Sequence, residues 1–414
     1  MLNMNELFAT ALGVNVPWHI EDVLFDAEEK ILEIRLDFKR GTKFPYINED
    51  KSIESCGAYD TVEKRWRHLN FFEHECYLIA RVPRLQNKAG NIQTYSPDWS
   101  GLSNGFTLLF EAIILQLAKS MPVNKISKML HVSDKKIWGV LDKYVDKARA
   151  FENYNEVTKI GVDETSITKG HNYISMFVDI VQRRTIFIAD GKSNDTVNQF
   201  KKDFHEHKGE VKNITDVSCD MSPAFIKGVK ENLPNAKITF DKFHVLKIIN
   251  EAVDTVRRDE VKDNPILKGN RYIFLKNECN LTAKQKKTKE ALKLSDLNLK
   301  SMDALNMREA FQQIYYTGSE IEFTSLLTDW HTWVSTSKLL PMAKAAQMVK
   351  NHWDGIINWK LSNINNGILE GLNSVVQAAK RKARGYKIKH FKTIAYLITS
   401  NLNFGKLNYA CIPT

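Results

Sequence analysis

The chain has 414 residues, of which 43% are hydrophobic and 26% charged, and it carries a formal net charge of +10. This length predicts two to four domains, and the excess of cations suggests a polyanionic partner such as a nucleic acid. The sequence contains no apolar run of about 18 residues and begins with no export signal. We therefore expect an intracellular protein that has no membrane partner.

Five cysteines, at positions 56, 76, 219, 279 and 411, are scattered along the chain and never form a CxxC pair. An odd number without paired spacing argues against a disulfide framework and fits a reducing compartment. Cysteine usage thus supports the intracellular assignment.

Residues 1–100 are predicted to form a β-rich region. Within residues 25–95, the segments KILEIRLDF and ECYLIARV alternate apolar and polar residues, and Gly, Asn and Asp lie between them. Alternation is the pattern of a half-buried strand, and the intervening residue types are typical of turns.

Residues 101–152 predict a helix-turn-helix domain. The segment FTLLFEAIILQLAKSM is an apolar helix, Pro122 opens a short second helix, and Ser133 is placed to cap a third. The predicted apolar residues of the second and third helices are Ile126, Met129, Leu130, Ile137, Val140, Leu141 and Tyr144. Two short helices with a tight turn are typical of DNA-binding units. The alternative is a helical linker that packs on itself.

Residues 153–260 alternate between strands and helices. Strands are predicted at 159–167, 172–181, 184–191, 213–220 and 236–241, and helices at 193–208, 222–233 and 242–260. Three meandering strands followed by α/β crossovers describe a mixed sheet with the element order of a ribonuclease H-like core. The predicted fold class is therefore α/β, with a core at 153–255, a helical insertion at 256–355 and further core helices at 356–414.

Asp163 stands in the middle of the first of these strands, within an apolar run. Asp220 ends the fourth strand, which this topology places beside the first, so we expect the two carboxylates to converge. Paired carboxylates repel each other, and a cation that prefers oxygen ligands, such as Mg²⁺, relieves the repulsion. An Asp at a strand end is also often a helix cap or a turn residue. An acid within a buried strand, however, needs partners, because unpaired burial costs several kcal/mol.

Glu370 is the candidate for a third acid. It belongs to the polar stripe of a helix predicted to start near residue 364, and the opposite face of that helix is apolar. The stripe comprises Asn366, Glu370, Asn373, Gln377, Lys380, Arg381 and Arg384, and the apolar face comprises Ile368, Leu372, Val375, Val376, Ala379 and Ala383. One acid followed by amides and cations suits metal chemistry beside a phosphate backbone. The alternative is a solvated surface acid.

The segment FDKFHVLK places Asp241 and His244 at the last junction between strand and helix. We expect these two residues to orient the site or to touch DNA rather than to ligate the metal. Taken alone, a histidine in such a position is more often a hydrogen-bonded structural residue.

The motifs GVDETS, CDMSPAF, FDKFHVLK and NNGILEGLNSVVQAAKRKARGY occur in this order along the chain. Together they resemble the DDE transposases of the ISL-three family of bacterial insertion sequences. The segment RWRHLNFFEHECYL and the helices that follow it resemble the N-terminal region of the same family, so the resemblance covers nearly the whole chain.

The resemblance implies an enzyme that binds the terminal inverted repeats of an insertion sequence, cleaves DNA and transfers the cut strand. Asp163, Asp220 and Glu370 would be the catalytic triad and would hold two Mg²⁺ ions about 4 Å apart, which Mn²⁺ can replace. The residues that would contact DNA are Lys135, Lys136, Asn373, Lys380, Arg381 and Arg384, with the lysines of residues 276–300. The implied partners are double-stranded DNA and further copies of the chain, at the nucleoid in the cytoplasm.

The sequence departs from the family in its N-terminal region. The family usually carries a zinc ribbon of two CxxC pairs, and here only Cys56 remains of that pattern. Because a tetrahedral zinc site needs four Cys or His ligands, we expect a degenerate zinc-ribbon-like β segment without structural zinc. Two other functions stay open, which are a DNA-binding regulator or decayed relative that no longer cuts, and a metal nuclease that cuts without joining.

Overall fold

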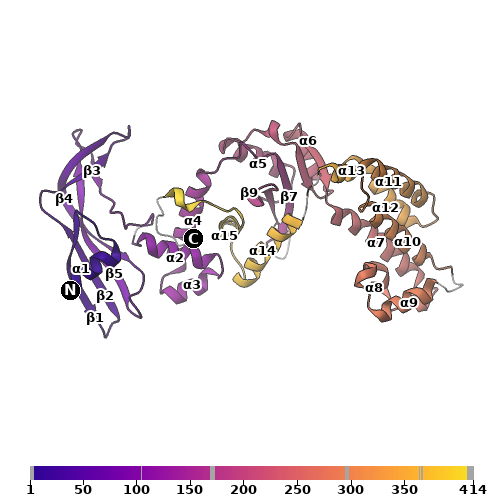
Figure 1. The fold of residues 1–414 in the computed structure, drawn as a ribbon, viewed down its shortest axis with the longest axis horizontal. Helices are drawn as coiled ribbons and strands as arrows, with labels where there is room; N and C mark the ends of the chain where they lie inside the picture. The colour runs from indigo at the N-terminus through magenta and orange to yellow at the C-terminus, as the bar shows by residue number, and fades with distance from the viewer. Residues whose placement is uncertain are drawn as a thin grey trace. The chain divides into compact units, whose positions relative to one another are not determined.

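The structure is a computed structural model that describes residues 4–103, 105–167, 173–293, 298–362, 364 and 367–407. The chain divides into two compact units, one of residues Met1–Glu152 with Ala378–Thr414 and one of residues Asn153–Gln377 (Figure 1). Two predicted positions, Asn366 and the first residue of the 172–181 strand, lie outside the described residues. No helix in the described ranges is both long and apolar enough to cross a membrane.

The first unit begins with a short helix and a six-stranded sheet. These elements are α1 (Met4–Leu12), β1 (Trp18–Asp26), β2 (Ile31–Phe38), β3 (Lys43–Ile47), β4 (Ile53–Arg67), β5 (Glu75–Gln86) and β6 (Ile92–Thr94). The strand order is β1-β2-β5-β4-β3, with β6 paired to β5. The predicted alternation is confirmed in β2, where every second residue from Leu32 to Phe38 is buried. Cys56 and Cys76 are both buried in this apolar core.

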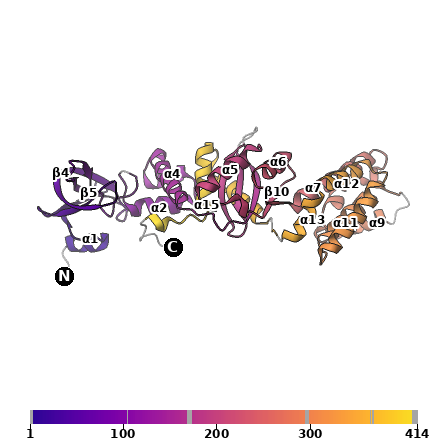
Figure 2. The ribbon, with the colours of Figure 1, turned by 90° about the horizontal axis from the view of Figure 1, so that it is seen from above.

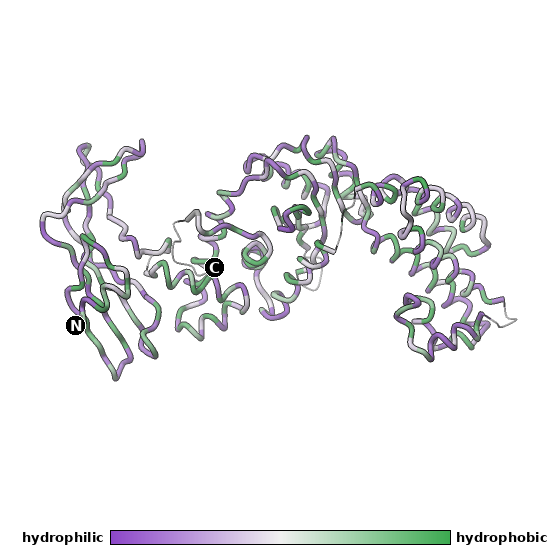
Figure 3. Tube along the Cα trace, in the orientation of Figure 1, coloured by the Kyte–Doolittle hydropathy of each residue, from purple (hydrophilic) through white to green (hydrophobic). Residues whose placement is uncertain are grey.

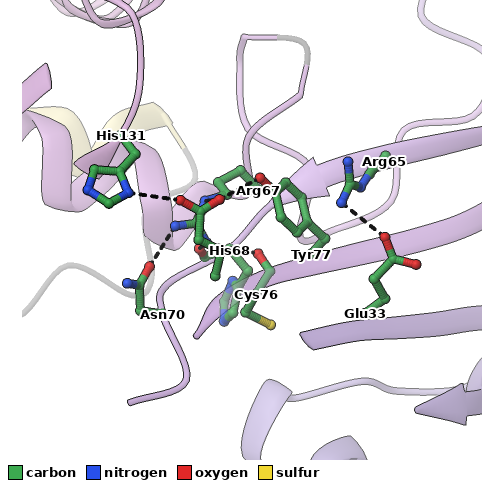
Figure 4. Close-up of polar contacts among 9 residues, drawn as sticks. Glu33, Arg65, Arg67, His68, Asn70, Cys76, Tyr77 and His131 are labelled. Carbon is green, nitrogen blue, oxygen red and sulfur yellow. Dashed lines mark hydrogen bonds and ion pairs between the residues drawn. The ribbon is translucent and has the colours of Figure 1, made fainter. Parts of the chain in front are cut away.

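The Arg-Trp-Arg-His segment at the end of β4 fastens the sheet to the helices that follow (Figure 4). The guanidinium of Arg67 donates to the carbonyl of Cys76 at 3.2 Å and to the side chain of Asn70 at 2.6 Å. Glu75 lies 3.7 Å from the same guanidinium and 3.2 Å from the ring of His131, the turn residue before the third helix. The motif is therefore a buried polar connection within this unit.

His68 continues this connection to the next helix. Its Nδ1 lies 2.9 Å from the hydroxyl of Thr107, which accepts a hydrogen bond from the amide of Phe110 at the start of α2. Burial and the nearby charge of Arg67 lower the pKa of His68 from 6.5 to about 4. The ring is therefore neutral near pH 7.

Three helices form the helix-turn-helix, namely α2 (Leu108–Ala118), α3 (Val123–Leu130) and α4 (Asp134–Ala150). The predicted core residues of α4 are all buried, as is Ile126 of α3. The prediction for Met129 was wrong, because this side chain is 59% exposed. The short α3 buries the side that carries Val123 and Ile126, and Met129 lies outside it in the last turn.

The C-terminal helix α15 (Ile388–Thr399) packs on α4. The rings of Trp138 and His390 stack with centroids 3.9 Å apart, and Lys389 forms an ion pair of 2.7 Å with Asp142. Residues 378–414 thus group with the helix-turn-helix, although the sequence prediction assigned them to the core.

The second unit contains a five-stranded sheet with the order β11-β10-β7-β8-β9. Its strands are β7 (Lys159–Ser166), β8 (Tyr173–Asp179), β9 (Arg184–Asp190), β10 (Asp216–Cys219) and β11 (Lys237–Phe240), and its connecting helices are α5 (Asp195–Glu206), α6 (Pro223–Asn232) and α7 (Lys242–Glu260). The first three strands are antiparallel, and β10 runs parallel to both β7 and β11. The predicted order of strands and helices is confirmed.

Helices cover both faces of this sheet (Figure 2). On one face, Phe177 of β8 stacks on Phe200 of α5 with ring centroids 4.6 Å apart. On the other face, α14 (Gly367–Ala383) lies along β7, where Leu369 contacts Gly161. The edge strand β11 packs against α13 (Trp353–Ser362), where Gly355 gives room for Phe240.

The helical insertion between α7 and α13 lies beyond the edge of the five-stranded sheet (Figure 1). It consists of α8 (Arg271–Leu275), α9 (Ala283–Lys293), α10 (Lys300–Ile314), α11 (Glu320–Ser335) and α12 (Leu340–Asn351). Green and purple alternate along these helices in Figure 3, as amphipathic packing requires. Helices α10 and α12 pack on α7, and the indole of Trp330 donates to the carbonyl of Met307 at 2.7 Å.

Candidate functional site

Three aspartates form a row across the sheet where its parallel strands end. In the strand register, Ser218 is paired with Gly161, and Cys219 is paired with Phe240. Continuing the register by one or two residues places Asp220 in line with Asp163 on one side and Asp241 on the other. Carboxyl ends of parallel strands are where α/β sheets carry their sites, so the topology itself gathers these acids.

Each aspartate of the row has one carboxylate oxygen held by a backbone amide. Asp163 accepts from the amide of Glu164 at 2.7 Å. Asp220 accepts from the amide of Ser222 at 2.9 Å, and Asp241 accepts from the amide of Phe243 at 2.8 Å. These bonds orient the three carboxylates through residues that follow them closely in the chain.

Asp163 is partly buried in the middle of β7. Burial raises its pKa, and the charges of Asp220 and Asp241 raise it further, whereas the amide of Glu164 and the ring of His244 act in the opposite direction. Its second oxygen accepts a short hydrogen bond from the side-chain amide of Asn373. The acid within the strand therefore has the partners that its burial demands.

Helix α14 is held on β7 by three residues of one face. Leu369 fills the space above Gly161, where a Cβ would lie only 2.7 Å from a Leu369 methyl. The hydroxyl of Thr165 donates to Asn373 at 2.8 Å, and the amide of Gln377 donates to the carbonyl of Ser166 at 3.4 Å. Gly161, Asp163 and Thr165 share one face of the strand because side chains alternate.

This packing corrects the predicted apolar face of α14. Of the six predicted residues only Val376 is fully buried, and Val375 is 47% exposed. Leu369, which the prediction omitted, is buried instead. The reason is that β7 offers polar partners to Asn373 and Gln377, so part of the polar stripe faces the sheet.

Glu370 is exposed on α14, three residues before Asn373. Residues three apart are neighbours on a helix surface, so its carboxylate extends from the turn that lies beside Asp163. Within the described residues, no three His, Cys, Asp or Glu side chains gather closely enough to hold a metal ion. The donor set nevertheless fits Mg²⁺ in kind, because it consists of carboxylates that repel one another.

His244 lies next to Asp241, the last acid of the row. Its Nδ1 is 3.6 Å from the second oxygen of Asp241, and the side chain is 40% exposed. In the part of the chain that the structure describes, this nitrogen has no hydrogen-bond partner. The ring is therefore close to Asp241 and partly exposed.

Sequence reasoning gave no role to Glu164, the second acid of the GVDETS motif. Burial raises the pKa of Glu164, and the charge of Asp220 raises it further. The ammonium of Lys192 lies 4.0 Å from its carboxylate. The only signal in the sequence was a second acid inside an apolar strand.

Most of the cations predicted to bind DNA are exposed or partly exposed in the structure. Lys135 and Lys136 are exposed in the first turn of α4. Arg381 is exposed near the end of α14, Lys380 is partly exposed, and Arg384 ends that helix in a left-handed conformation. Among the lysines of residues 276–300, Lys289 departs from the prediction, because it is buried and paired with Glu278 and Glu309.

Comparison with known proteins agrees with this arrangement. Residues 160–395 match the model of the DDE transposase family of ISL3 type, and residues 103–145 match the helix-turn-helix domain of transposase family ISL3. The chain is 26% identical over 362 residues to the transposase for insertion sequence element IS1001 of Bordetella parapertussis, covering 82% of this chain and 86% of that protein. It is 22% identical over 416 residues to the transposase for insertion sequence element IS1557 of Mycobacterium tuberculosis, covering 92% of each. The protein therefore belongs to the ISL3 family of DDE transposases and is a DNA-binding transposase of an insertion sequence.

Proposed function

We propose that this transposase cleaves and joins DNA with Asp163, Asp220 and Glu370 as its three catalytic carboxylates. The observation that carries the proposal is the contact between α14 and β7, which places Glu370 one helical turn from the amide that binds Asp163. The register that aligns Asp163 with Asp220 supports the pairing of the other two acids. We infer that the five-stranded sheet is the ribonuclease H-like core.

Divalent metal is required by this proposal, and Asp163, Asp220 and Glu370 would hold it. When bound, Mg²⁺ supplies a nucleophile at neutral pH and stabilises charge on the leaving oxygen in phosphoryl transfer. The backbone amides of Glu164 and Ser222 fix the orientation of the two aspartates. The side-chain amide of Asn373 donates to the other oxygen of Asp163 and so also orients this carboxylate.

Asp241 and His244 are proposed as positioning residues. Asp241 caps α7 and holds its carboxylate beside Asp220, and His244 lies against Asp241. The exposed side of the His244 ring gives a donor for a DNA phosphate beside the row of acids. Their role is to shape the charge around the catalytic carboxylates.

DNA binding is proposed for two separate sets of cations. Lys135 and Lys136 begin α4, the third helix of the domain, whose N-terminal residues would reach the bases of the terminal repeats. Lys380, Arg381 and Arg384, near the end of α14, would contact phosphates. Because cleaving and joining two DNA ends requires that they be held together, we infer a homo-oligomer acting at the nucleoid.

The N-terminal sheet is proposed to occupy the place of the zinc ribbon of the family. Its apolar core, which includes Cys56 and Cys76 from two different strands, would replace metal ligation as the source of stability. The segment would then contribute to recognition of the DNA end without zinc.

The test uses labelled duplex DNA from the ends of the element that carries this gene, incubated with the full chain and Mg²⁺. Wild type is expected to nick and then to join the ends, and Asp163→Asn is expected to bind the DNA without nicking. Asp303→Asn, which removes an exposed acid at the start of α10, is the matched control and should nick like wild type. Wild type that binds without nicking would indicate a regulator, and nicking without joined products would indicate a nuclease.

A further inference from the structure

A cavity of about 1060 Å³ opens directly beside the row of acids, between the start of α7 and the helical insertion. Asp241, the last acid of the row, contributes to its wall together with Lys242, Phe243, Gln312, Tyr316 and Trp359. A second cavity of about 540 Å³ shares Phe243 and Gln312 with the first, so the hollow continues along α7.

The wall carries aromatic rings that are exposed rather than buried in a hydrophobic core. Tyr316 is 74% exposed and Phe243 is 57% exposed. Exposed rings of this size are available for stacking on a flat partner. Behind them, the ammonium of Lys242 lies 4.8 Å from the ring centre of Tyr315 and 4.9 Å from that of Tyr316, which holds the Tyr316 ring in place.

The wall carries both amides and charged groups, the latter including Asp241, Lys242 and Lys360. The side chain of Gln312 donates to Asn277 at 2.9 Å, so this pair presents a fixed edge with both donors and acceptors. The two acids of the wall in the insertion, Glu278 and Glu309, are both neutralised by Lys289. The exposed rings and the amide pair of this wall suit a flat ligand that has hydrogen-bonding atoms on its edge.

We propose, on the basis of the proposed function, that this cavity receives one unstacked nucleobase of the DNA end whose phosphate lies at the row of acids. Nucleobases are flat and aromatic, and they carry donors and acceptors on their edges. Stacking on Tyr316 offsets the cost of leaving the duplex, as in other proteins that take a base out of the stack. The amides of Asn277 and Gln312 then contact the edge of the base.

The experiment measures binding by the full chain to end duplexes that carry 2-aminopurine at one position each, without divalent metal, so that no strand is cut. Near the terminus, one position is expected to change its emission on binding to wild type. Tyr316→Ala should abolish this change, and Tyr316→Phe, which keeps the ring, should restore it. Tyr272→Ala removes a tyrosine that is 57% exposed on α8 outside the cavity, and should behave like wild type.

A second measurement tests whether the base itself is the ligand. Tyr316→Ala is expected to weaken binding to the natural end about tenfold. On a duplex with an abasic site at the responding position, the same substitution should have no effect. An equal loss on both duplexes, or wild-type binding with no responsive position, would overturn the proposal. Binding of a free deoxynucleoside monophosphate at the cavity without any DNA response would also overturn it.

These readouts are separate from cleavage. A base response from a protein that never nicks in Mg²⁺ would refute the proposed function and leave the cavity proposal standing. Nicking without a base response would refute the cavity proposal and leave the proposed function standing.

Discussion

Gly161 is the residue through which the contact between α14 and β7 can be tested. A Cβ at this position would lie 2.7 Å and 2.8 Å from the two methyl carbons of Leu369, closer than side-chain atoms approach in folded proteins. In Gly161→Ala, Leu369 and the start of α14 must therefore move away from the strand. Glu370 is the next residue of that helix, so its carboxylate moves as well.

Overpacking of this kind costs about 1–3 kcal/mol. At about 2–4 °C per kcal/mol for a unit of this size, Gly161→Ala should lower the melting temperature by about 2–12 °C. Because a misplacement of about 1 Å can cost about 100-fold in rate, the nicking rate should fall by this order. Differential scanning calorimetry and single-turnover nicking of labelled end DNA measure the two effects.

The double variant Gly161→Ala/Leu369→Ala distinguishes the clash from other causes. Leu369→Ala by itself costs about 2–5 kcal/mol, because it empties a buried site. It also makes room for the new methyl group, so Gly161→Ala in this background should cost less than about 0.5 kcal/mol. The expected coupling is thus at least about 0.5 kcal/mol in favour of the double variant.

Gly371→Ala is the matched control on the same helix. A Cβ at Gly371 meets no atom of the described residues within 4 Å, and alanine in a helix is favoured over glycine by about 0.5–1 kcal/mol. This variant should melt at or above the wild-type temperature. If Gly161→Ala also melts like wild type, or if its cost is unchanged by Leu369→Ala, then the argument that Leu369 holds α14 against β7 is refuted.

Three further predictions follow from the site and the N-terminal unit. Asn373→Ala should slow nicking by about 10–100-fold at unchanged affinity for end DNA, because Asn373, which the sequence suggested as a DNA contact, binds Asp163 and Thr165 in the structure; an equal loss of binding would indicate the DNA contact instead. Replacing both Lys135 and Lys136 by Ala should reduce the slope of log affinity against log salt by about 0.9 for each lysine that contacts a phosphate, and an unchanged slope would show that neither touches the backbone. The pKa of His68 is about 4 in the folded chain and 6.5 when unperturbed, so the unfolded chain binds the extra proton and stability falls as the pH drops from about 7 to about 4, by up to about 3 kcal/mol. Urea unfolding of wild type and His68→Asn over this pH range should show that loss only in wild type, and parallel curves would refute it.

The sequence determined the order of strands and helices in the core, because each short strand is apolar and is bounded by turn residues. From that order it also determined the convergence of Asp163 and Asp220, since two adjacent parallel strands present their carboxyl ends at one edge. The buried side of α4 could also be predicted from the sequence, because Ile137, Val140 and Leu141 follow helical periodicity.

The tertiary structure alone decided which side of α14 meets the sheet. The sequence divides the helix into a polar stripe and an apolar face, but the side that packs combines Leu369 with Asn373 and Gln377 of the stripe. That choice depends on Gly161, Asp163 and Thr165 of a strand far away in the chain. The grouping of α15 with α4 and the cavity beside Asp241 depend in the same way on segments distant in sequence. Periodicity in the sequence indicates which residues of an element are suited to burial. Which surface they contact is decided by close packing in the tertiary structure, because two surfaces cannot occupy the same volume.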